Sequence, residues 1–275
     1  MRINPVKRAL KAGQTVFGSE LSRLRSPEVA QLYALAGFDF VFIDMEHSAF
    51  SLETVADMIA AARSAEIVPI VRVPQAEYAF VCRVLDQGAQ GLIIPRVNEP
   101  EQVRDIFSWM RYPPHGVRGY AATAGQTDYQ NVSPQTFIDS NNHETLCVIQ
   151  IERKEAFDHL DEMLSFPGVD VACLGYMDLS TDLGIPGQIE HPQMVALIER
   201  LIAVSQRHGI AAGIIGPQME PILHWMDKGM RFISYSTETL LLQEAAMSAA
   251  RRLRAARPQA AVPAAPAENS AHAGR

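Results

Sequence analysis

Val41-Phe42-Ile43-Asp44-Met45-Glu46-His47 is an apolar run that ends in ionisable side chains. Three consecutive apolar residues are typical of a strand buried on both faces, as in a parallel sheet beneath helices. In an α/β barrel, the carboxyl end of such a strand carries catalytic groups, so Asp44, Glu46 and His47 are candidates for proton transfer or metal support. The structural alternative is that Asp44 caps the following helix and that His47 is a hydrogen-bonded loop residue.

Similar apolar runs recur along the chain and alternate with helical patterns. The predicted strands are residues 15–18, 41–43, 67–71, 91–95, 146–151, 170–174, 211–215 and 232–235. The predicted helices are residues 1–13, 26–37, 51–62, 77–88, 100–110, 192–208, 218–228 and 238–254. Ser26-Pro27-Glu28 has the composition of a helix start, with Ser26 as the N-cap, and Gly37 is placed to end that helix. Ser51 is predicted to begin the next one.

Eight strands alternating with helices indicate a parallel sheet, and eight is the number that closes a (β/α)8 TIM barrel. We therefore predict an α/β protein with a single barrel domain over residues 1–255. An open doubly wound sheet is the alternative, but no glycine-rich phosphate loop follows the first strand. Residues 256–275 are rich in alanine and proline and are predicted to be a disordered tail. The irregular stretch 111–131 is long enough to be functional.

Composition narrows the classes of protein that this chain fits. It has 275 residues, of which 48% are hydrophobic, and a formal net charge of −7. The negative charge argues against nucleic acid as a partner. No apolar run approaches the length of a membrane span, and the N-terminus has no signal-peptide pattern, so we expect a cytoplasmic protein without a membrane partner. Cys82, Cys147 and Cys173 lack metal-ligand spacing and are expected to be buried free thiols.

Four of the predicted strands end in ionisable residues, which a barrel brings to one mouth. Besides the Asp44-to-His47 segment, these residues are Arg72, Glu152 and Asp178. Glu152 and Asp178 together suit one hard divalent cation, Mg²⁺, Mn²⁺ or Co²⁺, that keeps open positions for water and substrate oxygens. Arg72 is suited to stabilising a developing oxyanion. The alternatives are helix caps or salt bridges for the acids and a structural ion pair for Arg72.

Lysine is missing from every predicted strand end. Lys154 is two residues beyond Glu152 and is interpreted as a helix start. A Schiff-base mechanism, which needs a lysine in the pocket, is therefore disfavoured.

Several stretches, in this order, resemble the HpcH/HpaI aldolases, the metal-dependent pyruvate aldolases, over residues 13–250. The matching stretches are Ala36–Asp39, Ile43–His47, Val71-Arg72, Val84–Ala89, Arg111–Pro114, Arg118-Gly119, Gln150–Glu152 and Asp178–Ser180. The resemblance implies a (β/α)8 barrel that assembles as a homo-oligomer, often a hexamer. It also implies a lyase that converts 4-hydroxy-2-oxo acids into a pyruvate-type enolate and an aldehyde.

The resemblance also implies roles for individual residues. Glu152 and Asp178 would bind the metal, and Arg72 would stabilise the transition state. The general base would be His47, tuned by Asp86. The substrate-binding residues would be Gln150, the backbone around Met177, and Asp178, with Asp44 as a supporting acid.

The chain departs from the family pattern in two places. Tyr176-Met177 stands where the family commonly has Pro-Ala or Pro-Asn, beside the carboxylate pocket. Gly18-Ser19-Glu20 stands where better-known members have Gly-Leu-Trp. Three alternatives stay open: other enolate chemistry, such as 2-oxo acid decarboxylation or acyl-CoA cleavage; a non-catalytic oxo-acid or metal-binding protein; and a purely structural oligomer.

Overall fold

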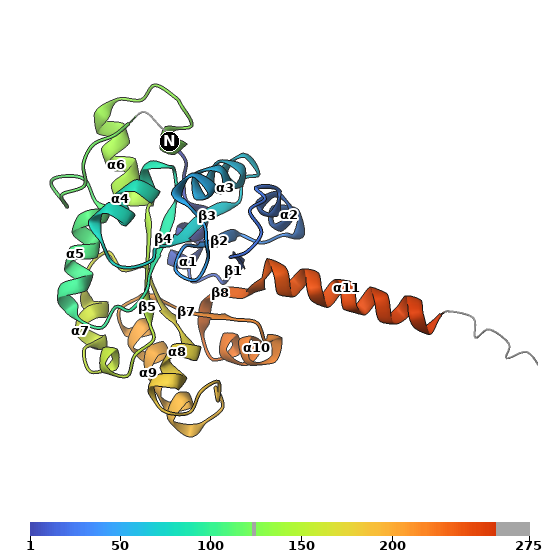
Figure 1. Ribbon diagram of the computed structural model, residues 1–275. Coiled ribbons are helices and arrows are strands. Elements are labelled where there is room, and N and C mark those ends of the chain that lie inside the picture. The colour runs from blue at the N-terminus through green and yellow to red at the C-terminus, as the bar shows by residue number, and fades with distance from the viewer. Residues whose placement is uncertain (123–124, 257–275) are drawn as a thin grey trace, which may run out of the picture. The chain divides into compact units, whose positions relative to one another are not determined.

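The protein forms a closed barrel of parallel strands. A computed structural model describes residues 1–122 and 125–256, and in this part of the chain neighbouring strands pair in sequence order, with β8 returning to β1 (Figure 1). The strands are β1 (Val16–Leu21), β2 (Phe40–Asp44), β3 (Val68–Arg72), β4 (Gly91–Ile94), β5 (Leu146–Ile151), β6 (Val171–Leu174), β7 (Ala211–Gly216) and β8 (Met230–Thr237). The predicted (β/α)8 barrel is confirmed.

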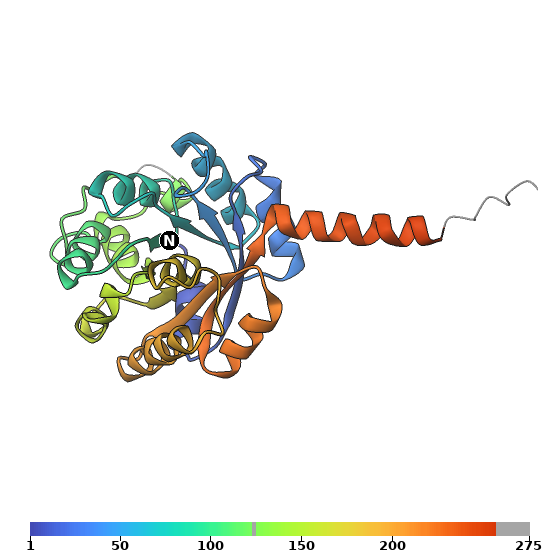
Figure 2. The same cartoon turned by 60° about the horizontal axis from the view of Figure 1, so that its bottom comes forward.

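The longer helices between α2 and α10 lie outside the ring of strands, as the two views in Figures 1 and 2 show. The α-helices are α1 (Pro5–Lys11), α2 (Glu28–Ala36), α3 (Leu52–Ser64), α4 (Tyr78–Asp86), α5 (Pro100–Met110), α6 (Pro134–Glu144), α7 (Leu160–Ser165), α8 (Tyr176–Asp182), α9 (Pro192–Arg207), α10 (Met219–Asp227) and α11 (Glu238–Ala255). Two short 3-10 helices are η1 (Gly125–Thr127) and η2 (Glu155–Phe157). The sequence prediction had no helix at α6, α7 or α8, whereas the predicted helix start at Lys154 is confirmed by η2, which this residue precedes. Helix α6 buries only Phe137, so it has no apolar periodicity to detect.

Helix starts depend on local hydrogen bonds that composition only partly predicts. Ser51 caps α3 as expected, since its Oγ accepts the Thr54 backbone N–H at 3.2 Å. The prediction for Ser26 is wrong, because its hydroxyl contacts the Glu28 carboxylate instead of a backbone N–H. Gly37 ends α2 in the left-handed conformation, with φ of 90°.

The chain divides into two compact units, Met1–Leu240 and Leu241–Arg275. The first contains the whole barrel, and the described part of the second continues helix α11. Apart from Ala256, the predicted tail lies outside the described residues. The three cysteines are buried free thiols, as expected. No described helix combines the length and apolarity that a membrane span requires.

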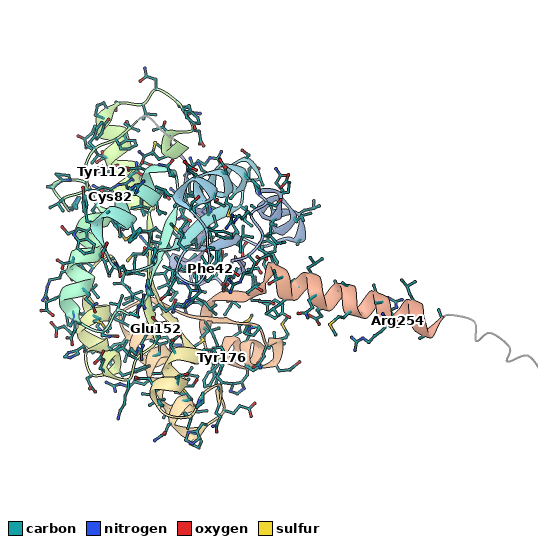
Figure 3. The ribbon with its side chains drawn as sticks, viewed as in Figure 1. Phe42, Cys82, Tyr112, Glu152, Tyr176 and Arg254 are labelled. Carbon is teal, nitrogen blue, oxygen red and sulfur yellow. The ribbon has the colours of Figure 1, made fainter. Side chains whose placement is uncertain are left out.

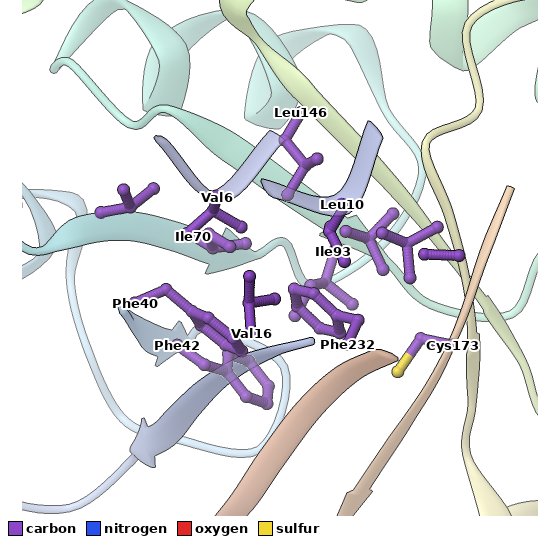
Figure 4. Close-up of a cluster of buried hydrophobic side chains, with 14 residues drawn as sticks. Val6, Leu10, Val16, Phe40, Phe42, Ile70, Ile93, Leu146, Cys173 and Phe232 are labelled. Atoms are coloured by element: carbon purple, nitrogen blue, oxygen red, sulfur yellow. The ribbon is translucent and has the colours of Figure 1, made fainter. Parts of the chain in front are cut away.

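Side chains on alternate strand positions fill the barrel interior. On β2 these are Phe40 and Phe42, and Phe232 of β8 stacks on Phe40 with ring centroids 4.5 Å apart (Figure 4). Val6 and Leu10 of α1 join the same cluster and cover the end where the strands begin. The apolar filling therefore occupies the amino-terminal part of the barrel. At the opposite end, the same inward positions carry polar and ionisable side chains.

Gly18 leaves room for the aromatic ring of Phe40 in the core. A Cβ atom at this position would lie 2.3 Å from the Phe40 ring, closer than atoms approach without displacement. Gly18→Ala is therefore expected to lower the free energy of unfolding by about 1–3 kcal/mol through overpacking. Urea denaturation measures this change. Gly119→Ala is the control, since its Cβ would meet only the Tyr78 hydroxyl, at 3.3 Å. Equal stability of the two variants would contradict the prediction.

Candidate active site

A cavity of about 340 Å³ opens at the carboxyl ends of the strands. Its lining residues come from strands β1, β3, β5, β7 and β8, from the loops after β2, β6 and β7, and from helices α8 and α11. The lining residues are Glu20, His47, Arg72, Gln150, Gly175, Tyr176, Met177, Asp178, Ile215, Gly216, Pro217, Ser236, Thr237 and Leu240. The volume is within the usual range for small-molecule sites.

Asp44 organises the loop that carries His47. Its side chain is fully buried and accepts the backbone N–H groups of Glu46 at 2.9 Å and His47 at 3.1 Å. It also accepts from Arg72 Nε at 2.8 Å, because β2 and β3 pair with these two residues side by side. The carboxylate is therefore enclosed by protein donors. These contacts suit Asp44 to the supporting role that the family resemblance implies, and any direct contact between Asp44 and substrate stays a prediction.

Arg72 is a buried cation that faces the cavity. Besides its bond to Asp44, its Nε lies 3.4 Å from a Glu46 carboxylate oxygen, and its Nη1 donates to Gln150 Oε1 at 3.4 Å. The guanidinium carbon lies 5.0 Å from the centroid of the Phe42 ring. These contacts restrain the guanidinium plane from three sides. A buried guanidinium held in this way is suited to binding a negatively charged oxygen.

Glu152 lies directly beneath the cavity lining, at Gly175. A Cβ atom on Gly175 would be 2.6 Å from a Glu152 oxygen, so the glycine lets that carboxylate approach the loop after β6 (Figure 3 labels Glu152 and Tyr176). The Arg96 backbone N–H donates to Glu152 Oε1 at 2.7 Å, and the Gln150 side-chain amide donates to Oε2. Burial raises the pKa of Glu152, and the nearby charge of Asp178 raises it further.

His47 is an accessible residue of the cavity lining. Its side chain is 60% exposed, and Nε2 lies 3.7 Å from a Glu46 oxygen. Burial raises the pKa of Glu46, with a smaller contribution from Glu152, while Arg72, His47 and Arg96 oppose that change. An accessible imidazole beside a carboxylate is suited to moving a proton to or from a bound molecule.

Within one chain, Asp86 is not among the residues that line the cavity. It ends α4, the helix that leaves the carboxyl end of β3 and returns to the start of β4. Its carboxylate accepts from Arg118 Nη2 at 2.7 Å. Asp86 and His47 lie at opposite ends of the barrel, so the structure does not place Asp86 where it could tune His47 directly.

Tyr176 and Met177 both line the cavity. The Tyr176 ring is largely buried and packs toward Gly216, where a Cβ atom would be only 3.2 Å from Cε1. The glycine on β7 thus accommodates the bulk that distinguishes this chain from the family pattern. Met177 is 51% exposed at the rim. Its backbone oxygen accepts from Ser180 Oγ at 2.9 Å and Thr181 Oγ1 at 2.8 Å.

Three polar residues of the cavity were not identified from the sequence: Glu20, Ser236 and Thr237. The first strand was predicted to end at Gly18 and the last at Tyr235, which placed these residues in loops. In the structure Glu20 pairs with Phe42 and with Thr237, so β1 and β8 both extend to the mouth. Two-residue alternation from Val16 would have directed Glu20 inward, had the first strand been extended.

Comparison with known proteins places this architecture in a family. The model of the HpcH/HpaI aldolase/citrate lyase family matches residues 22–245. The chain belongs to this family. The resemblance inferred from the sequence is confirmed.

Similar proteins in the family cover nearly the whole chain. A hydroxypyruvate/pyruvate aldolase of Delftia acidovorans is 32% identical over 97% of this chain and 98% of its own. A 4-hydroxy-2-oxo-heptane-1,7-dioate aldolase of Escherichia coli is 33% identical over 92% of this chain and 95% of its own. The crystal structure of an HpcH/HpaI aldolase from Desulfitobacterium hafniense superimposes with a TM-score of 0.86, at 30% identity, and covers 93% of this chain and 98% of that one.

Proposed function

We propose that this HpcH/HpaI family member is a metal-dependent carbon–carbon lyase that cleaves 4-hydroxy-2-oxo acids into a pyruvate-type product and an aldehyde, or joins them. One observation carries the proposal. One cavity brings together groups from four strand ends. Asp178, Arg72 and His47 line it, and Glu152 lies beneath its lining at Gly175. The aldolase names of relatives that span the chain support the same reaction. These names give less support to the alternatives of other enolate chemistry or of a non-catalytic protein that binds an oxo acid or a metal.

The residues present fit a divalent cation. Glu152 and Asp178 supply hard oxygen donors, and burial raises the pKa of Glu152, with a smaller contribution from the nearby charge of Asp178. A bound cation would offset that repulsion. Among the described residues, no group of three or more His, Cys, Asp or Glu side chains is arranged to hold a metal, so two carboxylates would leave positions open for water and substrate. Mg²⁺, Mn²⁺ and Co²⁺ all suit such a site.

When bound, the cation supplies Lewis acidity that polarises the 2-oxo group of the substrate. The remaining work falls to the chain. Arg72 stabilises the oxygen that gains negative charge as the C–C bond breaks. Gln150, fixed between Arg72 and Glu152, and the backbone at Met177 orient the oxo acid. His47 accepts the proton of the 4-hydroxyl group during cleavage and returns it during addition.

Glu46 and Asp44 support these groups without contacting substrate. Asp44 holds the His47 loop against Arg72, and Glu46 places a negative charge beside both cations. The homo-oligomer that the family resemblance implies stays a prediction, which sedimentation of the full chain would measure.

The experiment that tests the proposed function compares metal and Schiff-base mechanisms. Lysine is absent from the residues that line the cavity in the described part of the chain, so no amine is available to form an imine. A chelator is expected to abolish pyruvate release from a 4-hydroxy-2-oxo acid, and Mn²⁺, Co²⁺ or Mg²⁺ to restore it. Borohydride added with pyruvate is expected to leave the mass of the protein unchanged. A trapped lysine adduct would refute the proposed mechanism.

A further inference from the structure

Glu20 is an ionisable side chain of the cavity that the proposed mechanism leaves unused. It is half-buried at the carboxyl end of β1, and the alternation that directs Val16 into the core directs Glu20 into the cavity. It lies across the cavity mouth from Glu152, because β1 stands opposite β5 in the closed ring of strands.

The groups around Glu20 leave its carboxyl only partly compensated. Arg72 of β3 attracts its charge, while Asp44 of β2 and Glu238 at the start of α11 repel it. The Ser22 hydroxyl is a hydrogen-bond partner of Glu20, and the phenol of Tyr33 from α2, whose pKa is raised mainly by burial, also senses the charge of Glu20. Burial is the largest influence and raises the pKa of Glu20 to about 7.

Arg72 attracts Glu20 but is shared with two other acids. Its Nε is already bonded to Asp44 at 2.8 Å and lies 3.4 Å from a Glu46 oxygen. A ligand on the β1 side of the cavity therefore meets the Glu20 carboxyl and two hydroxyl-bearing residues, Ser236 and Thr237. The neighbouring β7 wall, with Ile215 and Pro217, is apolar.

We propose that Glu20 forms the part of the cavity that receives the aldehyde, and that it selects aldehydes carrying a hydroxyl group over those carrying a carboxylate. The inference rests on the proposed function. If the oxo acid is held at Arg72, Gln150 and the cation, the reacting aldehyde is left with the β7, β8 and β1 walls. A hydroxyl group of the aldehyde would donate to the Glu20 carboxylate, and the carbon chain of the aldehyde would pack on Ile215 and Pro217. The Glu20 carboxylate would repel an aldehyde that carries a carboxylate of its own.

The charge state of Glu20 gives this selection a distinct pH dependence. Burial raises the pKa of Glu20 to about 7, so the carboxyl becomes progressively ionised as the pH rises through that value, and its repulsion of an anionic aldehyde grows with it. Aldehyde carboxyl groups stay ionised on both sides of this value. The comparison with Glu20→Gln assigns this pH dependence to Glu20, because the other residues of the cavity are the same in both proteins.

The test measures kcat/KM for addition of pyruvate to four aldehydes, with Mn²⁺, at pH values on both sides of 7. Glyceraldehyde is compared with propionaldehyde, which lacks its hydroxyls, and butyraldehyde with succinic semialdehyde, which adds a carboxylate. The expected result for the native chain is a preference for glyceraldehyde and a discrimination against succinic semialdehyde that grows as the pH rises through 7. Glu20→Gln should reduce that discrimination by about tenfold or more and make it independent of pH.

Glu53→Gln removes the same charge from the exposed surface of α3 and should change neither ratio. The effect of Glu20→Gln should fall on the KM for the aldehyde, which a purely structural role would not predict. Ratios that are independent of pH in the native chain, or unchanged in Glu20→Gln, would overturn the inference while leaving the aldolase intact. Absence of addition with all four aldehydes would instead overturn the proposed function, and the inference with it. The pH series on the native chain tests the inference even if the variant fails to fold.

Discussion

Glu152→Ala is expected to lose its divalent cation and to release pyruvate from a 4-hydroxy-2-oxo acid more than about 100-fold more slowly. Changes to groups that merely support metal ligands typically cost about 10–100-fold, so removal of a ligand should cost more. The site has only two protein carboxylates, and a cation cannot keep its place when half of them is removed. Asp178→Ala should behave in the same way. Elemental analysis beside steady-state kinetics measures both effects.

Glu152→Gln is the matched variant, because it keeps the size of the side chain and an oxygen that can accept from the Arg96 N–H. It should also lose the metal. Since burial raises the Glu152 pKa, the ionised carboxylate lowers stability at neutral pH, and in chelator Glu152→Gln should melt no lower than the native chain. Glu162→Ala, on the exposed surface of α7, should retain both metal and activity. Full metal content in Glu152→Ala and Asp178→Ala would remove these residues from the site.

His47→Ala is expected to keep its metal and its affinity for pyruvate but to lose kcat by about 10²–10⁴-fold, the usual contribution of a general base. The structure gives the reason. The ring is exposed to the cavity, and the loop that carries it is held by Asp44 through backbone N–H groups, which alanine retains. The variant should therefore fold normally and lack only the proton acceptor.

His191→Ala provides the comparison for His47→Ala. His191 caps α9 through a hydrogen bond from the Gln193 N–H, and it is not among the residues of the cavity lining. Its replacement should lower stability slightly and leave kcat unchanged. Loss of metal from His47→Ala, or full turnover by that variant, would show that the imidazole has another role.

The order and type of the principal elements followed from local patterns. Buried strands of a parallel barrel are continuous apolar runs, so Val41–Ile43 and Leu146–Ile151 were recognised without knowledge of their neighbours. Helix α5 began at Pro100 and ended at Met110 as predicted, because its proline start and its apolar spacing are both local. Helices α7 and α8 have six and seven residues, too few for a periodic pattern.

Residues of the candidate site could be predicted only where the sequence located the end of a strand. Arg72, Glu152 and Asp178 end or closely follow recognisable strands, and the closure of eight strands brings them to one mouth. Glu20 escaped prediction because Ser19-Glu20-Leu21 is not an apolar run. Its strand conformation is imposed by pairing with β2 and β8, neighbours that are distant in the sequence.

The sequence by itself determined the fold class, the family and the residue types at the strand ends, because these depend on composition and spacing along the chain. Only the tertiary structure decided what each ionisable side chain faces. It enclosed Asp44 among three N–H donors, carried Asp86 to the opposite end of the barrel, and brought Glu20 into the cavity. Burial and charge at a side chain depend on atoms from several strands at once, and no single stretch of sequence contains them.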